Sequence, residues 1–166
     1  MRSMKRCFRP LFVDNLGGES METFVKTFDE LTTTELYEIL QARAEVFIVE
    51  QDCVYQDLDG VDQDAYHVYI KENGKIMAYL RVIDRGKRLD EVSIGRVITL
   101  ARRRGYGTLI MTVGFAVARE KFGAERIKIG AQVQAQPFYE TLGFKVCSGE
   151  YMEDGIPHIY MLKKLN

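Results

Sequence analysis

The stretch that decides the fold is residues 92–121, which read VSIGRVITLARRRGYGTLIMTVGFAVAREK. Its first third has the β-branched content of a buried strand, and its last half repeats apolar residues at helical spacing. The loop between them, residues 102–107 (RRRGYG), holds three arginines and two glycines. A helix that begins there presents unpaired N–H groups and the positive end of its dipole, and glycine lets the backbone approach an anion. We therefore predict a strand, a phosphate-binding loop and a helix.

The loop alone leaves an alternative open. It lacks the Gly-Lys-Ser/Thr end of a P-loop and the third glycine of a dinucleotide fingerprint. An ordinary strand-to-helix turn with solvated arginines fits this stretch by itself equally well.

A second motif lies downstream, at residues 132–144 (QVQAQPFYETLGF). The pattern Arg-x-x-Gly-x-Gly followed by this segment resembles the GNAT family of N-acetyltransferases. That family has an Arg-x-x-Gly-x-Gly pyrophosphate loop and an Asn-x-x-Ala-x-x-x-Tyr-x-x-x-Gly-Phe segment, in which Gln132 here replaces the usual Asn. The resemblance covers roughly residues 24–164. Residues 46–51 (VFIVEQ), 55–60 (YQDLDG) and 153–158 (EDGIPH) resemble the ElaA-type subgroup of small bacterial acetyltransferases.

Composition bounds the class of protein. The 166 residues carry a net charge of −1, which argues against general nucleic-acid binding. No apolar run reaches the length of a membrane span. Three cysteines without metal or disulfide spacing read as reduced thiols of a cytoplasmic protein. Residues 1–20 read as an N-terminal extension and residues 21–166 as one domain. The apolar run in residues 1–20 is too short for a signal peptide.

The remaining elements follow from periodicity and turn chemistry. A helix should begin at Thr32, where Glu35 completes a capping box, and Asn73-Gly74 should form a hairpin turn. Gly95 inside the central strand indicates a bulge or a close backbone approach. We expect strands near residues 24–28, 66–71, 76–83, 92–98, 126–131, 144–152 and 158–162, and a short helix at 134–142.

The fold class is therefore α/β (α+β), a single domain with a mixed sheet and helices on both faces. The resemblance implies six or seven strands, a sheet splayed at its centre, a bulged central strand and four helices.

Charged residues on apolar faces need partners. Arg43 lies in the apolar stripe of the first helix, and Arg96 lies between apolar residues of the central strand. Each reads as a structural ion pair or as a wall of a substrate pocket. The acidic loop at residues 52–64 fails the calcium-loop template, since Asp62 stands where Gly is required when counting from Asp57. That loop reads either as solvated surface or as carboxylates, Asp57 and Asp59 among them, that attract a cationic amine. No metal site is predicted.

The resemblance implies how acetyl-CoA would bind and react. Tyr139 stands where the family keeps its general acid, and a backbone N–H near Val97 would hold the carbonyl oxygen as it becomes negative. The implied cofactor-binding residues are Val97, Ile98, Thr99, Arg102, Arg103, Arg104, Gly105, Tyr106, Gly107, Thr108, Gln132 and Phe138.

The base that deprotonates the amine is open among Glu50, His67 and His158, of which Glu50 and His67 are assigned as catalytic residues with Tyr139. A chain of water molecules that ends on a carboxylate is an equal alternative. No Ser/His/Asp or Cys/His arrangement is legible, so direct attack by the amine is favoured over an acyl-enzyme. Substrate-pocket residues are expected to be Arg43, Phe47, Asp57, Asp59 and His158.

The sequence thus predicts an N-acetyltransferase acting on a primary amine of a small cationic molecule or a peptide, with neither nucleic-acid nor membrane partners. It leaves a homodimer open. Two other classes remain: a non-catalytic acyl-CoA-binding module, and a binder of nucleic acid or another anionic partner that uses the clustered basic residues Arg81, Arg85, Lys87, Arg88 and Arg102 to Arg104. The balancing acidic loop and the lack of interleaved aromatic residues speak against the anion binder.

Overall fold

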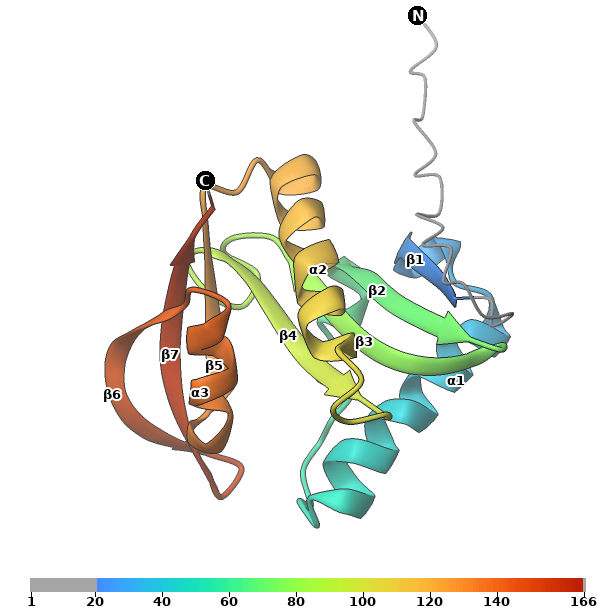
Figure 1. Ribbon diagram of the computed structural model, residues 1–166, viewed down its shortest axis with the longest axis horizontal. Coiled ribbons are helices and arrows are strands. Elements are labelled where there is room, and N and C mark those ends of the chain that lie inside the picture. The colour runs from blue at the N-terminus through green and yellow to red at the C-terminus, as the bar shows by residue number, and fades with distance from the viewer. Residues whose placement is uncertain (1–20, 166) are drawn as a thin grey trace, which may run out of the picture.

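The computed structural model describes residues 21–165, so the predicted extension at residues 1–20 lies outside the described residues. Seven strands form one mixed sheet in the order β1-β2-β3-β4-β5-β7-β6 (Figure 1). They are β1 (Met21–Thr27), β2 (Ala65–Glu72), β3 (Lys75–Ile83), β4 (Val92–Thr99), β5 (Arg126–Gln132), β6 (Lys145–Glu153) and β7 (Ile156–Lys164). Only the β4–β5 pair is parallel among these neighbours. The predicted mixed sheet is confirmed.

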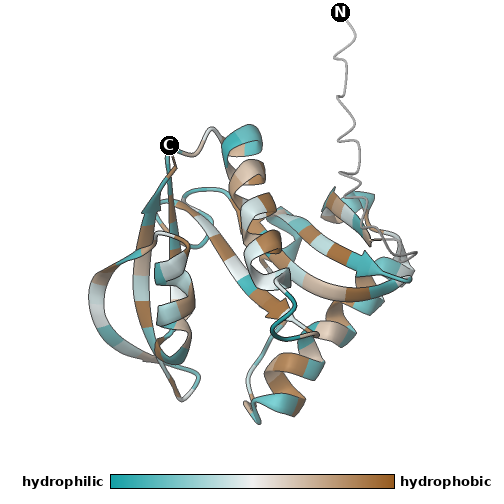
Figure 2. Ribbon diagram, in the orientation of Figure 1, coloured by the Kyte–Doolittle hydropathy of each residue, from teal (hydrophilic) through white to brown (hydrophobic). Residues whose placement is uncertain are grey.

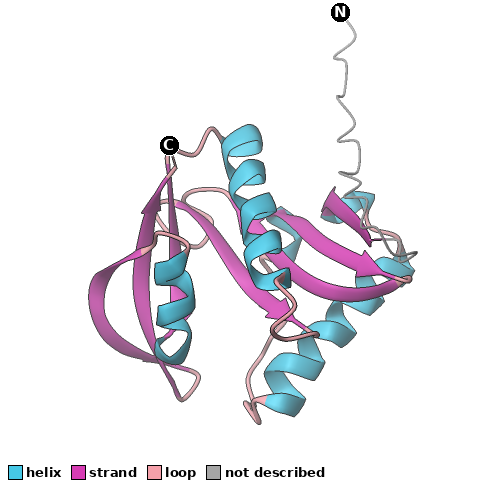
Figure 3. Ribbon diagram, viewed as in Figure 1, coloured by secondary structure: helices cyan, strands magenta, loops and turns pink. Residues whose placement is uncertain are grey.

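Three α-helices accompany the sheet in the described part of the chain: α1 (Thr33–Ala44), α2 (Tyr106–Phe122) and α3 (Gln136–Thr141) (Figure 3). The resemblance implied four. The segment Glu45–Glu50 continues α1 as a π-helical turn instead of forming a separate helix. Short 3₁₀ turns lie at Phe28–Glu30, Asp62–Asp64 and Val133–Ala135.

Local sequence signals set the ends of these elements. The Thr32 hydroxyl accepts the Glu35 N–H at 3.2 Å, and the Glu35 carboxylate accepts the Thr32 N–H at 2.9 Å, which confirms the capping box. Asn73 and Gly74 have φ of 51° and 77°, as a tight hairpin between β2 and β3 requires. Gly123 ends α2 in the left-handed conformation.

The two faces of the sheet carry different helices. Apolar residues of β2, β3 and β4 pack against α2, while the alternate residues face α1. Figure 2 shows the apolar segments of these strands in brown. Gly114 lets α2 lie close, because a Cβ there would stand 3.0 Å from the Leu80 side chain and 3.1 Å from that of Ile94. The α1 face holds Tyr69, Tyr79 and a set of buried charges described below.

A bulge in β4 opens the sheet. The β3–β4 register passes from Tyr79↔Ile98 to Arg81↔Gly95, so that Arg96 and Val97 together oppose one residue of β3. Arg96 takes a positive φ of 52° at this point. β4 pairs with β5 only at Val92↔Ile127 and Ser93↔Lys128, and beyond these pairs the two strands diverge (Figure 1). The predicted bulge and central splay are both confirmed, and they separate a half with α1 and α2 from a half with α3.

Candidate active site

The loop after β4 leads directly into α2. Gly105 precedes the helix with φ of 80°, and nothing lies within 4 Å of the place that a Cβ would take. Arg103 also has a positive φ, 61°. The first N–H groups of α2 have no partner within the helix and stand at the positive end of its dipole. The loop therefore has the open, donor-rich form that binds phosphate.

The arginines of this loop have different partners. Arg104 and the Tyr106 hydroxyl both bond Glu72 at the end of β2, at 3.1 and 2.6 Å, and so fasten the loop to the sheet. Arg102 is 70% exposed and pairs with Glu50 at 2.6 Å. Exposed pairs of this kind contribute little to stability, so Arg102 is available to an anion.

Gly107 is required by the packing of α2 against α3. A Cβ at this position would lie 3.1 Å from the Phe138 ring and 3.9 Å from the Thr99 methyl group. The glycine thus lets α3 pack against the first turn of α2. The sequence argument, that both glycines serve the approach of an anion, is supported by the geometry of Gly105 alone.

A cavity of about 600 Å³ occupies the splay between the two halves of the sheet. One wall comes from β3, β4 and the residues after α1, and the other from β5, β6, β7 and α3. Of the predicted site residues, it is lined by Phe47, Asp59, Val97, Arg102, Gln132, Tyr139 and His158. Glu50, His67, Arg43 and Asp57 are not among its lining residues. The cavity thus brings Arg102, from the loop before α2, together with the bulge and the second motif.

Tyr139 stands on α3 with its ring half-buried in this cavity. The ring packs against Phe138 and Phe144, with centroids 5.2 and 5.8 Å away. Within residues 21–165 its hydroxyl has no hydrogen-bond partner, and burial raises its pKa to about 12. The phenol is therefore protonated and free to donate.

The two histidines differ in what their nitrogens can do. His67 is fully buried; its Nε2–H donates to the Asp62 carbonyl and its Nδ1 accepts from the Tyr79 hydroxyl, both at 2.9 Å. Burial lowers its pKa and keeps the ring neutral. His158 lines the cavity, and its Nδ1–H donates to the Ile156 carbonyl at 2.8 Å, which leaves the lone pair on Nε2. The catalytic assignment of His67 is therefore corrected, because its only lone pair is already used inside the protein.

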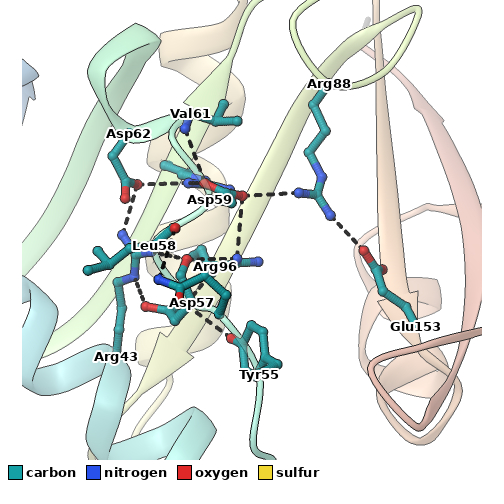
Figure 4. A network of polar contacts seen from close by, with 12 residues as sticks. Arg43, Tyr55, Asp57, Leu58, Asp59, Val61, Asp62, Arg88, Arg96 and Glu153 are labelled. Atoms are coloured by element: carbon teal, nitrogen blue, oxygen red, sulfur yellow. Dashed lines mark hydrogen bonds and ion pairs between the residues drawn. The ribbon is translucent and has the colours of Figure 1, made fainter.

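Three carboxylates of the acidic loop, those of Asp57, Asp59 and Asp62, are neither solvated surface nor free (Figure 4), whereas Asp52 and Asp64 are exposed. Asp57 bonds Arg43 at 2.8 Å and Arg96 at 2.7 Å, and it accepts the Tyr55 hydroxyl at 3.0 Å. Asp62 accepts Arg43 at 2.8 Å and Arg81 at 2.7 Å. Burial alone would raise the pKa of Asp62, but the two guanidinium groups outweigh it and hold that pKa below its usual value.

Asp59 completes this buried ion cluster. It pairs with Arg81, with Arg96 at 3.4 Å and with Arg88 at 3.1 Å, and Arg88 also reaches Glu153 at 2.8 Å on the other half of the sheet (Figure 4). The prediction that Asp57 and Asp59 attract a cationic amine is wrong in its premise, since arginines already neutralise both. Arg43 is a structural ion-pair residue, the first of the two readings of its position.

Known proteins were compared with this chain. A family model described as an acetyltransferase (GNAT) domain matches residues 16–165. The chain belongs to the GNAT family. It is 37% identical over 150 residues to a UPF0039 protein of Schizosaccharomyces pombe, covering 88% of this chain and 99% of that one. The crystal structure of Escherichia coli ElaA is 35% identical with a TM-score of 0.80, over 87% of this chain and 99% of that one.

A third relative points to the same chemistry. The crystal structure of an acyl-CoA N-acyltransferase from Pseudomonas aeruginosa is 37% identical, with a TM-score of 0.81 over 87% of this chain and 99% of that one. This GNAT protein is thus a GNAT-type transferase with an acyl-CoA co-substrate.

The geometry fits an acyl-CoA. Gly105 leaves open space before α2 that a phosphate could occupy, and the splay between β4 and β5 leaves strand edges unpaired where an extended arm could bond. Gln132 replaces the family's Asn, and its side-chain amide forms hydrogen bonds within the protein. It donates to Gln51 at 2.9 Å and accepts from Gln134 at 2.7 Å. Residues 21–165 contain no group of three or more His, Cys, Asp or Glu that could hold a metal, and no helix among them is long and apolar enough to cross a membrane.

Several residues that line the cavity of this GNAT protein were not predicted from the sequence as site residues. Tyr55, Arg88, Ser93, Tyr151, Glu153 and Tyr160 all line the cavity. Tyr151 stacks on Tyr160 with ring centroids 4.6 Å apart and lies beside His158. The alternation of His158 and Tyr160 along β7 is the one signal that indicated a shared face.

Proposed function

We propose that the protein is an acetyl-CoA-dependent N-acetyltransferase that moves an acetyl group to a primary amine of a small molecule or peptide by direct attack. The observation that carries the proposal is the cavity that extends from Arg102, in the loop before α2, past the β4 bulge to Tyr139. Family membership supports acyl transfer from an acyl-CoA. The choice of acetyl and of a primary amine is part of the proposal.

The loop before α2 would hold the phosphates of acetyl-CoA. Gly105 keeps the approach open, and Arg102 lies at the edge of the cavity with an exposed side chain. Bound there, acetyl-CoA supplies the thioester whose acetyl group is transferred. Arg104 and Tyr106 act on the loop itself by tying it to Glu72.

Two groups would act on the reacting carbonyl and sulfur. The bulge turns β4 so that a backbone N–H near Val97 is free of a regular ladder partner and suits a developing oxyanion. Tyr139 donates its phenolic proton to the departing sulfur, for which a free, protonated hydroxyl in the cavity is the requirement.

His158 is the base that best fits removal of the amine proton. Its Nε2 carries the lone pair, and Glu153 Oε2 lies 3.9 Å from that nitrogen. Glu50 is paired with Arg102 and does not line the cavity. Direct attack is supported because neither cavity nucleophile has a base beside it: Ser93 has no hydrogen-bond partner in the described chain, and Cys53 Sγ donates to the Asp154 carbonyl at 3.5 Å.

A free-thiol assay tests the proposal. Purified protein with acetyl-CoA should release CoA thiol at a rate that depends on an added amine, in a panel of amino acids, amino acid amides, polyamines, aminoglycosides and peptides. Binding of CoA by calorimetry, with no amine-dependent release from any panel member, would instead assign a non-catalytic acyl-CoA-binding module.

A further inference from the structure

One wall of the cavity carries hydrogen-bond donors that lack acceptors. Arg81 Nε and Ser93 Oγ are buried without a partner in residues 21–165, and both residues line the cavity. Arg96 lines it too. Its Nη2 donates to the Asp57 carbonyl at 3.0 Å, and its Nε lies 2.7 Å from Asp57 Oδ1 without the geometry of a hydrogen bond. Its Nη1 donates no hydrogen bond within residues 21–165. Buried donors without acceptors cost free energy, so native proteins rarely leave them unmatched. Arg81 is 0% exposed and Ser93 2%, so of these three residues only Arg96, with a side chain 14% exposed, can meet a ligand.

Arg96 is held rigidly for such a task. Its guanidinium lies over the rings of Tyr55 and Phe47, at 5.4 and 6.0 Å from their centroids, and its Nε pairs with Asp57 at 2.7 Å. Its backbone has the positive φ of 52° at the bulge, a conformation that side chains other than Asn, Asp and Gly seldom adopt. Strain of this kind is typical of functional sites, and a fixed cation binds an anion at a smaller entropic cost.

The position of Arg96 limits the size of the ligand. It belongs to the same bulge as Val97, where the proposed function places the reacting carbonyl. A ligand atom that bonds Arg96 Nη1 is thus within one side-chain length of the reacting centre. The facing wall has the opposite chemistry, because the lone pair on His158 Nε2 suits an amine.

We infer that the acceptor is a compact, amino acid-like amine whose carboxylate binds Arg96 Nη1 while its amine lies against His158. The inference rests on the proposed function and names the substrate class of that same site. It replaces the cationic acceptor expected from the sequence, because Asp57 and Asp59 are already paired with arginines. Arg96 is paired with both carboxylates as well, but its Nη1 still donates no hydrogen bond within residues 21–165. A polyamine would leave that donor unpaired.

Matched acceptors test the inference. Thiol release from acetyl-CoA is measured for several amino acids and for their carboxamides, which keep the amine and remove only the negative charge. The wild-type protein should show a kcat/KM about 10-fold to 100-fold higher for the acids, the scale of one hydrogen bond between charged groups. The α-amine of a carboxamide is less basic than that of the matching acid, so a larger fraction of it is unprotonated and able to attack. Without a contact to the carboxylate, the amides would therefore be expected to react faster than the acids.

Substitution of the arginine assigns the effect. In Arg96→Lys the acid-to-amide ratio should fall to near 1, because kcat/KM should fall further for the acids than for the amides. The matched control is Arg126→Lys, on an exposed arginine that pairs with Glu91 outside the cavity, and its ratio should equal that of wild type. Should Arg96→Lys fold poorly, Arg96→Gly suits the positive φ, and added guanidinium ion should restore turnover of the acids more than of the amides.

The outcomes separate the two ideas. Turnover of amides equal to or faster than that of acids in wild type, or an acid preference that survives in both Arg96 variants, overturns the inference and leaves amine acetylation standing. Absence of thiol release with every amine overturns the proposed function, and the inference with it.

Discussion

At Tyr139 a single hydroxyl carries the proposed acid chemistry, which makes it the sharpest residue to change. Tyr139→Phe keeps the ring contacts with Phe138 and Phe144 and removes only the proton donor. We expect kcat to fall roughly 10²-fold while acetyl-CoA affinity holds within a few-fold. Tyr37→Phe, on an exposed tyrosine of α1, is the control and should keep wild-type kcat.

The pH profile adds a second reading of Tyr139. Burial raises its pKa to about 12, so its protonated form persists through the usual assay range. Loss of this phenol's proton should therefore cause no fall in kcat below about pH 10. Wild-type kcat in Tyr139→Phe would show that the residue only packs and that the acid lies elsewhere.

The two histidines give a paired prediction. His158→Gln removes the only lone pair that a histidine presents to the cavity, so kcat should fall about 10²-fold with little change in acetyl-CoA affinity. His67→Gln replaces a ring whose two nitrogens bond Asp62 and Tyr79 inside the protein; it should cost stability and spare kcat. Steady-state rates with saturating amine, read beside thermal melting curves, distinguish the two. The reverse pattern would return the base to His67.

The element that the site depends on most is the junction of β4 and α2, where Gly105 has φ of 80°. Gly105→Ala places a Cβ in a left-handed residue, at a cost of roughly 1 kcal/mol, and should distort the phosphate loop. We expect the Kd for acetyl-CoA to rise at least about 5-fold. Gly123→Ala imposes the same kind of strain at the other end of the same helix, with φ of 57°, and should leave the Kd unchanged. Calorimetric titration with acetyl-CoA compares the two variants. Equal Kd values would mean that the loop at Gly105 does not bind the phosphates.

Elements of this fold could be predicted from the sequence where the signal is local. The capping box at Thr32, the Asn73-Gly74 turn, the bulge marked by Gly95 and the loop before α2 each depend on a few consecutive residues. The contact of Gly107 with Phe138 could not be predicted, since it joins two helices that are separated along the chain. Local rules show that a glycine is needed and do not show which neighbour requires it.

The charge cluster shows the same limit across the whole molecule. Arg43 and Asp62 are 19 residues apart in sequence, Arg81 and Asp59 are 22 apart, and Arg88 and Glu153 are 65 apart. Sequence reasoning predicted that Arg43 and Arg96 need partners, yet nothing local could show that the acidic loop folds back onto them. It therefore assigned these carboxylates to an amine substrate, whereas the fold uses them to join α1, β3 and β4 on one side of the cavity.

That cluster makes the stability of the whole molecule depend on pH in a predictable direction. Asp59 and Asp62 have pKa values held below their usual range by arginines, against the effect of burial, and that of Glu35 is lowered to about 2 by Lys26, Thr32 and Tyr69, also against burial. Carboxyls of this kind stabilise the fold above their unfolded pKa, near 4, and the contribution is lost as the pH falls below it.

His67 acts earlier in the same direction, because burial lowers its pKa and the unfolded chain binds a proton near pH 6.5 that the folded chain refuses. The free energy of unfolding should therefore be level down to about pH 7, fall by at most about 1.4 kcal/mol per pH unit below 6.5, and fall more steeply below about pH 4. Denaturant titrations from pH 3 to 8 measure this curve. His67→Gln should abolish the first decline and keep the second. A wild-type curve that stays flat from pH 7 to 5 would mean that His67 takes up its proton in the folded state, and the neutral, internally bonded ring assigned to it would be wrong.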